Sequence, residues 1–157
     1  MSLTVKTTAP IFQKLSDLKE EYGFDELGLA VSGGSDSLAM LYICNDWALE
    51  KKVKLHCVTV DHKLRPESLK EAELVADHCK GLGIHHEVVE WKHEKELSGN
   101  LSDLARSARY ELIDKWRKEL SFVLVGHTKN DQIETFFMNL KRGSGIEGMK
   151  GMPLSFK

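Results

Sequence analysis

Apolar and polar residues along the chain alternate between two patterns. Four short runs rich in apolar and β-branched residues have the length of strands, namely residues 27–31, 53–60, 85–91 and 122–126. After each run, apolar residues recur at the spacing of one helix face, in residues 36–50, 66–82, 101–118 and 129–141. This alternation predicts an α/β fold with an open, mostly parallel sheet of four to five strands, because parallel strands need crossover connections. We expect helices on both faces of the sheet and a fifth strand no more than begun near residues 153–156.

Composition and charge narrow the class of protein. The chain has 157 residues, of which 41% are hydrophobic and 29% are charged. It is therefore one domain's worth of ordinary globular sequence, which excludes collagen-like, mucin-like and largely disordered chains. The formal net charge of −2 supplies no general positive field for a nucleic acid, so any polyanion would have to meet a local basic patch.

The distribution of apolar segments and cysteines points to an intracellular setting. No apolar run approaches the ~20 residues that cross a bilayer, and no basic segment followed by an apolar one marks a secretion signal. We therefore expect a cytoplasmic protein with no membrane partner. Cys44, Cys57 and Cys79 are widely spaced in apolar segments, a pattern typical of buried free thiols rather than of disulfides or a metal site.

The residues that follow the first predicted strand suit an anion. Ligands of parallel sheets bind beyond the carboxyl ends of the strands, and residues 32–37 (SGGSDS) stand there, directly before a helix. The two glycines let the backbone turn tightly and approach a ligand, while hydroxyls and the N–H groups of the helix start donate to a phosphate. The segment lacks the Lys of the P-loop pattern. The alternative is a plain strand-to-helix turn with Ser35 or Asp36 as N-cap.

Charged residues follow the second strand and line a later helix. Asp61 ends the strand, where a carboxylate can fix a ribose hydroxyl or a metal, and Arg65 suits a phosphate or a nucleic-acid backbone. A solvated loop is the alternative for the basic residues there. Arg106, Arg109 and Tyr110 share a helix face, and two guanidiniums beside a phenol suit phosphate binding or base stacking. The alternative for this face is exposure to solvent without a ligand.

Two further segments follow the fourth strand. In residues 126–135, Asp131 is a candidate ligand for Mg²⁺ or an amine, and His127 is a candidate hydrogen-bonding or proton-handling group. Thr128 and Asp131 also have the spacing of a capping box, which is the alternative. Residues 141–148 contain three glycines in G-x-G-x-x-G register but follow a helix, which argues against dinucleotide binding. They are interpreted as a helix C-cap and flexible loop, or as a mobile basic lid.

Five segments, in the same order, resemble the N-terminal catalytic domain of the tRNA(Ile)-lysidine synthetases, a family of PP-loop ATP pyrophosphatases. They are SGGSDS at 32–37, DHKLRPES at 61–68, ARSARY at 105–110, GHTKNDQIET at 126–135 and RGSGIEGMKGM at 142–152. The first segment identifies only the wider superfamily, and the second and fifth narrow it. The resemblance implies an adenine nucleotide alpha hydrolase-like, Rossmann-like domain with a core at about residues 24–152. The family continues beyond this point into a tRNA-binding domain, so the chain resembles a truncated enzyme.

The resemblance implies a ligase that uses ATP and Mg²⁺. In the family, the C2 oxygen of the wobble cytidine of a CAU-anticodon isoleucine tRNA attacks the α-phosphate, pyrophosphate leaves, and the ε-amine of free lysine displaces AMP. The implied catalytic residues are Asp36, Arg109, His127, Asp131 and Glu134, of which Asp36 and Asp131 would hold the metal. ATP would bind Ser32, Gly33, Gly34, Ser35, Asp36, Ser37 and Asp61. The tRNA and lysine would meet Arg65, Arg106, Arg109, Arg142, Gly143, Ser144 and Gly145.

Two positions depart from the family pattern. Thr128 and Asn130 stand where the family has a His and an Asp, which removes one carboxylate from the implied metal or amine site. These changes suggest one alternative, an ATP-binding module without catalysis. A related tRNA thiolase is a second alternative, and the absence of a Cys-x-x-Cys pair stands against it. For the assembly, a homodimer is one alternative.

Overall fold

The computed structural model describes residues 5–63, 68–92 and 101–126. Side chains are described from residue 8 in the first of these ranges and from residue 104 in the last. Residues Met1–Val125 form one compact unit, and Gly126–Lys157 form a second. The predicted helix at 129–141 and the predicted start of a strand at 153–156 lie outside the described residues.

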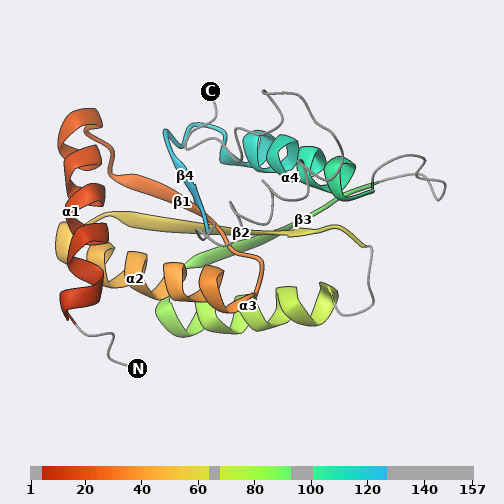
Figure 1. Cartoon of the computed structure of the whole chain (residues 1–157), viewed down its shortest axis with the longest axis horizontal. Helices are drawn as coiled ribbons and strands as arrows, with labels where there is room; N and C mark the ends of the chain where they lie inside the picture. Colours follow the sequence, from red (N-terminus) through yellow and green to blue (C-terminus); the bar gives the residue numbers. More distant parts are fainter. Residues whose placement is uncertain (1–4, 64–67, 93–100, 127–157) are drawn as a thin grey trace, which may run out of the picture. The chain divides into compact units, whose positions relative to one another are not determined.

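Helices and strands alternate along the described chain (Figure 1). Their order is α1 (Val5–Tyr22), β1 (Glu26–Ala30), α2 (Ser35–Lys51), β2 (Lys54–Asp61), α3 (Ser68–Leu82), β3 (His85–Glu90), α4 (Leu101–Arg117) and β4 (Val123–Val125). The four predicted strands are confirmed, as are the three predicted helices that fall within these ranges, with ends that agree to within one or two residues. None of these helices has the length and apolar character needed to span a membrane.

The helix α1 is absent from the sequence prediction, which begins with a strand and is wrong in this respect. Pro10 lies inside the helix and no acidic residue opens its first turn, so the usual signals of a helix start are missing. Its apolar side chains nevertheless have helical spacing, since Phe12, Leu15 and Leu18 all pack on the core. The Trp47 Nε1 group of α2 donates to Ser16 Oγ at 3.1 Å, which ties α1 to α2.

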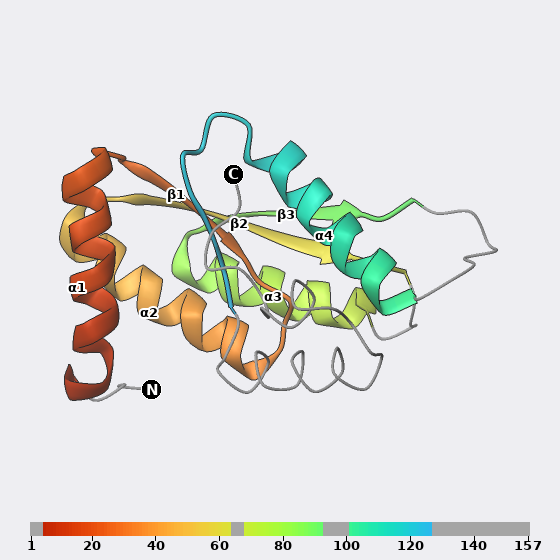
Figure 2. The same cartoon turned by 45° about the horizontal axis from the view of Figure 1, so that its top comes forward.

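The four described strands form one parallel sheet in the order β3-β2-β1-β4. Ala30 pairs with Val58 of β2 on one side and with Val125 of β4 on the other, so β1 is an inner strand (Figure 2). The chain leaves β1 toward β2 and returns to the opposite side of β1 at β4. The parallel α/β sheet is confirmed, and its strand order reverses at the carboxyl end of β1, where ligands of such sheets bind.

Helices cover both faces of the sheet, as predicted. α2 and α3 lie on one face and α4 lies on the other (Figure 1). The core of the first face includes Leu27, Leu29, Val31, Leu41, Trp47, Leu55, Cys57 and Val75. On the second face Val58 packs with Ile113 and Trp116 of α4. Alternate residues of β1 and β2 therefore serve the two cores, as the period of a strand requires.

Gly28 of β1 allows side chains of α4 and β4 to lie close to the β1 backbone. A Cβ atom at this position would lie 2.9 Å from Val123 Cγ2 and 3.2 Å from the Trp116 ring. Both distances are shorter than van der Waals contact, so any side chain here would displace its neighbours. A glycine inside a strand often marks such a close approach.

The three cysteines are buried and free, as predicted. Burial raises the pKa of the Cys44 thiol to about 12. A hydrogen bond with Cys79 and burial together raise the pKa of Cys57. Because the thiolate is the reactive form, Cys44 and Cys57 are poor nucleophiles and poor metal ligands.

Candidate functional site

Residues 32–37 form the turn between β1 and α2, and the buried Ser37 holds it together. The Ser37 hydroxyl donates to the Gly34 carbonyl at 2.9 Å and accepts from the Ser32 backbone N–H at 3.2 Å. The Ser32 hydroxyl lies 3.2 Å from the same oxygen and donates to it, because the Ser37 proton is already committed. Ser32 and Gly34 are exposed. The turn is thus fixed from within, while its outer rim is open to a ligand.

The first turn of α2 is open to an anion. Its N-cap is Gly34, which makes no side-chain cap hydrogen bond, so the alternative with Ser35 or Asp36 as N-cap is wrong. Ser35 and Asp36 instead lie within the first turn and are exposed. The N–H groups of this turn carry the partial positive charge of the helix dipole. An uncapped helix start after a strand is an arrangement that binds phosphates.

The two glycines of the loop have different roles. Gly33 has φ +90°, and a Cβ atom there would lie 3.2 Å from the backbone oxygen of Glu71 in α3. Gly33 therefore permits both the turn and the close packing of the loop on α3. At Gly34 the nearest atom to an added Cβ is Ser32 Oγ, at 3.7 Å. The space beside Gly34 is open, and a ligand can approach the backbone there.

Asp61 ends β2, the strand next to β1, and is 6% exposed. Its Oδ1 accepts the Lys63 backbone N–H at 2.8 Å, and its carbonyl accepts the Trp91 N–H at 2.8 Å. One carboxylate oxygen therefore shapes the turn that follows β2. Lys63 forms an exposed ion pair with Glu90 at 2.7 Å, as expected of a solvated loop residue. The contact of Asp61 with a ribose stays a prediction.

Arg109 of α4 meets His62, the residue after Asp61. Its Nε donates to His62 Nε2 at 3.3 Å, and the His62 ring packs edge-on against Trp91 with ring centroids 5.9 Å apart. Burial lowers the pKa of Arg109, although a guanidinium stays charged at neutral pH. Burial and the Arg109 charge also lower the pKa of His62, which favours a neutral imidazole. Arg109 is half-buried, so the alternative of a fully exposed basic face is wrong for this residue.

The structure brings part of the predicted site to one edge of the sheet. The loop at 32–37 follows β1, Asp61 ends β2, and Arg109 reaches the same strand end from α4 through His62. Arg106 is half-buried one turn before Arg109. His62 is missing from the predicted site, although its position directly after Asp61 was a usable signal.

The other predicted site residues lie outside the described residues. They are Arg65, His127, Asp131, Glu134, Arg142, Gly143, Ser144 and Gly145. Within the described ranges, no group of three or more His, Cys, Asp or Glu side chains could hold a metal ion.

Behind the loop, Thr59 of β2 supports the end of β1. Thr59 is 3% exposed, and its hydroxyl donates to the Val31 carbonyl at 2.8 Å. His86 Nε2 lies 2.9 Å from the same hydroxyl. Because a hydroxyl has one proton, His86 must be the donor in this second bond. A buried hydrogen bond from Thr59 therefore holds Val31, the residue that precedes the loop, and a partly buried bond from His86 holds Thr59.

Thr59→Val is expected to lower the free energy of unfolding by about 1–3 kcal/mol, since it leaves the Val31 carbonyl and the His86 N–H without their partner. Urea unfolding measures the change. Thr59→Ser keeps the hydroxyl and is the control, with a smaller loss that reflects one missing methyl group. A Thr59→Val protein as stable as the wild type would show that these hydrogen bonds contribute nothing.

The stability of the fold should depend on pH through two histidines. Burial is the main cause that lowers the pKa of His62 and of His86. Such groups bind protons more readily in the unfolded chain than in the folded one. The free energy of unfolding is therefore highest above the unfolded pKa of about 6.5, and it declines as the pH falls below that value. We expect the urea midpoint to drop between about pH 7 and pH 5, with a smaller drop in His86→Gln. Equal drops in the wild type and in His86→Gln would contradict this cause.

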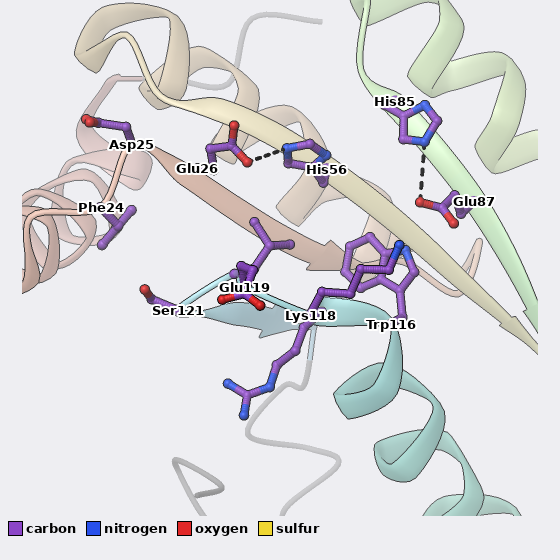
Figure 3. Close-up of a pocket in the computed structure, with 12 residues that line it drawn as sticks. Phe24, Asp25, Glu26, His56, His85, Glu87, Trp116, Lys118, Glu119 and Ser121 are labelled. Atoms are coloured by element: carbon purple, nitrogen blue, oxygen red, sulfur yellow. Dashed lines mark hydrogen bonds and ion pairs between the residues drawn. The ribbon is translucent and has the colours of Figure 1, made fainter.

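A separate pocket opens at the opposite edge of the sheet (Figure 3). Its volume is about 570 Å³, and side chains at the amino ends of strands line it, among them Glu26, His56 and His85. His56 Nε2 lies 3.1 Å from Glu26, and His85 Nε2 lies 3.3 Å from Glu87. Because the loop at 32–37 follows the carboxyl end of β1, this pocket is not part of the candidate site.

Named relatives match most of this chain and a smaller part of their own length. A tRNA(Ile)-lysidine synthase of Wolbachia pipientis is 39% identical over 146 residues, which cover 90% of this chain and 33% of the relative. That of Brucella anthropi is 42% identical over 149 residues, which cover 89% and 32%. That of Ruegeria pomeroyi is 44% identical over 128 residues, which cover 80% and 30%. The chain spans about a third of the length of these curated relatives.

Solved structures share the fold at low sequence identity. The U34-tRNA thiolase NcsA from Methanococcus maripaludis, with its 4Fe–4S cluster, has a TM-score of 0.69 at 17% identity, over 91% of this chain and 53% of that chain. An NH3-dependent NAD synthetase from Campylobacter jejuni has a TM-score of 0.56 at 13% identity, over 92% and 76%. These neighbours confirm the adenine nucleotide alpha hydrolase-like fold. Residues 7–157 match the family described as the PP-loop domain, and the chain therefore belongs to that family.

Proposed function

We propose that this chain is the ATP-binding, catalytic part of a tRNA(Ile)-lysidine synthase, a cytoplasmic ligase that joins lysine to the wobble cytidine of the CAU-anticodon isoleucine tRNA. The observation that carries the proposal is the loop at 32–37, which leaves the start of α2 uncapped and open to an anion at the carboxyl end of β1. Relatives with 39%, 42% and 44% identity carry that enzyme name and supply the reaction.

The proposed reaction has two steps. In the first, the C2 oxygen of the cytidine attacks the α-phosphorus of ATP, the bond to the β-phosphate breaks, and pyrophosphate leaves with the electrons of that bond. In the second, the ε-amine of lysine attacks C2, the C2–O bond breaks, AMP leaves, and the nitrogen gives up a proton. Holding nucleotide, base and amine together can supply several kcal/mol, up to about 7–11 in the best cases.

The chain's own residues suit the first step. The N–H groups at the start of α2, beside Gly34, bind the departing pyrophosphate, and the exposed Ser32 and Ser35 add donors. Ser37 acts from behind, because its hydroxyl is already engaged within the loop. Arg109 stabilises the negative charge that develops at the α-phosphate.

Asp36 fits a magnesium ion. It is an exposed carboxylate in the first turn of α2, and proteins hold Mg²⁺ with one or two carboxylates together with substrate phosphates. When bound, the ion neutralises charge on the leaving pyrophosphate. Asp131 is the second ligand in this proposal, and it orders the lysine together with His127 and Glu134. Asp61 binds the ribose.

The net charge of the chain is −2, so individual basic side chains bind the tRNA phosphates in this proposal. Arg106 lies beside Arg109 on α4 and contributes a half-buried guanidinium. The proposal adds Arg65, Arg142 and the segment 143–145 on the tRNA side. Phosphate contacts dominate affinity for nucleic acids, so in this proposal these cations are the residues of this chain that bind the tRNA backbone.

Pyrophosphate exchange tests the proposal. With the full-length protein and the CAU-anticodon tRNA, radiolabelled pyrophosphate should enter ATP, and adding lysine should release one AMP for each lysine attached. Absence of exchange in a protein that binds ATP normally would overturn the ligase. Asp131→Asn separates the ligase from an ATP-binding module without catalysis, because the ligase loses turnover, whereas the module has none to lose.

The tRNA thiolase is the weaker alternative. Likeness to the thiolase structure at 17% identity establishes the fold alone. The three cysteines of this chain are all buried in the core that α2 and α3 form with the sheet, with none at the loop that opens α2. A sulfur-transfer reaction that needs a cysteine of this chain would therefore lack an accessible thiol.

A further inference from the structure

We propose that His62 positions Arg109 for its contact with the ATP phosphates by accepting the Nε–H of the guanidinium without neutralising its charge. The inference rests on the proposed function in taking ATP as the ligand. His62 is a positioning residue in this proposal, because it touches Arg109 rather than the nucleotide.

The contact joins two elements that are far apart in the sequence. His62 follows β2, Arg109 lies in the middle of α4, and 47 residues separate them. The hydrogen bond from Nε to Nε2 is 3.3 Å long. On its other side the imidazole packs edge-on against Trp91 at 5.9 Å. Since both partners are half-buried, the ring is held in one plane and directs the guanidinium.

The chemistry of this partner matters for the charge of Arg109. A carboxylate would fix an arginine but also cancel its positive charge. Within the described residues no carboxylate forms an ion pair with Arg109, and its side-chain hydrogen bond goes to His62. The charged side chains on the surrounding elements are Asp61, Lys63, Glu90 and Arg106. A half-buried guanidinium held by a neutral imidazole keeps its attraction for an incoming phosphate.

The hydrogen bond also selects one tautomer. Because Nε2 accepts the bond, a neutral His62 carries its proton on Nδ1. Nδ1 is buried, and it has no hydrogen-bond partner in the part of the chain that is described. A buried donor without a partner is unfavourable for stability. The proton nevertheless lies on Nδ1, because Nε2 must be unprotonated to accept the bond from Arg109. Within the described ranges, no hydrogen bond engages the two terminal nitrogens of Arg109, and in this proposal they bind the ligand.

ATP affinity tests the role through two variants. His62→Leu removes the acceptor, and we expect ATP to bind about 10-fold more weakly. His62→Gln offers an amide oxygen to the same N–H and should recover most of that loss. Adenosine, which has no phosphate, should bind the wild type and both variants equally. His85→Leu removes an exposed imidazole at the opposite edge and is the matched control, with wild-type affinity for ATP.

A double-mutant cycle separates positioning from an independent effect. In the Arg109→Ala background, His62→Leu should cause no further loss of ATP affinity, because its effect passes through Arg109. An undiminished loss in that background, or an equal loss for ATP and adenosine, would overturn the proposal.

Nitrogen-15 NMR of the imidazole decides the question even where His62→Leu fails to fold. At neutral pH we expect His62 to show a protonated Nδ1 and an unprotonated Nε2, and this preference should weaken in Arg109→Ala. The opposite tautomer, or a doubly protonated ring at pH 7, would overturn the proposal. If the expected tautomer is present and the wild type does not bind ATP, the proposed function fails and the His62–Arg109 pairing remains as a structural contact only, which also overturns its role in ATP binding.

Discussion

Arg109→Ala is expected to slow ATP–pyrophosphate exchange by about 100- to 1,000-fold, the effect of removing one preorganised donor to a developing charge. The guanidinium is half-buried and is held through Nε by His62, and among the described residues no hydrogen bond takes its terminal nitrogens, which in the proposed function meet the α-phosphate. Arg109→Lys should recover only part of the rate, because an ammonium is a point charge without the fork of a guanidinium. Initial exchange rates with the full-length protein and tRNA measure the effect.

Arg117→Ala is the matched control on the same helix. Arg117 forms an exposed ion pair with Asp114 at 2.7 Å, and such pairs contribute little to stability. Its exchange rate and its unfolding midpoint should both stay near those of the wild type. An Arg109→Ala enzyme that keeps exchange within about 10-fold of the wild type would remove Arg109 from the phosphate site.

Gly33→Ala is expected to lower the free energy of unfolding by at least about 1–2 kcal/mol and to abolish ATP binding. Left-handed backbone costs an alanine roughly that amount, and Gly33 has φ +90°. The new methyl group would also press on the Glu71 carbonyl at 3.2 Å, so the loop must shift. A shift of about 1 Å is enough to spoil a catalytic geometry. Urea unfolding and ATP titration measure the two effects.

Gly34→Ala distinguishes an effect on ATP binding from an effect on the stability of the fold. Gly34 has an ordinary φ of −70°, and within the described part of the chain an added Cβ would meet only Ser32 Oγ, at 3.7 Å. Its stability should therefore stay within about 0.5 kcal/mol of the wild type, while its ATP affinity falls because the methyl group fills the space that the ligand approaches. Unchanged ATP affinity would contradict phosphate binding at this loop, and a fully stable Gly33→Ala would contradict the strain at Gly33.

The strands of this fold could be predicted from the sequence because each is a short apolar run between clear breaks. Parallel pairing followed from the alternation with helices. The helix α1 could not be predicted in the same way, because Pro10 lies inside it and its stability comes from packing of side chains such as Leu15 on the core. Tertiary contacts of this kind override weak local signals.

The site could be predicted in part. Residues 32–37 and Asp61 directly follow or end strands, and the topology of a parallel sheet brings such positions to one edge. The N-cap at Gly34 could not be predicted from residue types, since serine and aspartate are the usual caps. The contact of Arg109 with His62 could not be predicted either, because it spans 47 residues and depends on how α4 packs over the sheet.

The identity of the products tests the central claim most directly. The full-length protein would be incubated with ATP labelled at the α-phosphate, free lysine and the unmodified CAU-anticodon tRNA. We predict that AMP and pyrophosphate form in equal amounts and match the lysine attached to the wobble cytidine. Formation of ADP and inorganic phosphate, or AMP release with no lysine on the tRNA, would contradict lysidine synthesis by this site.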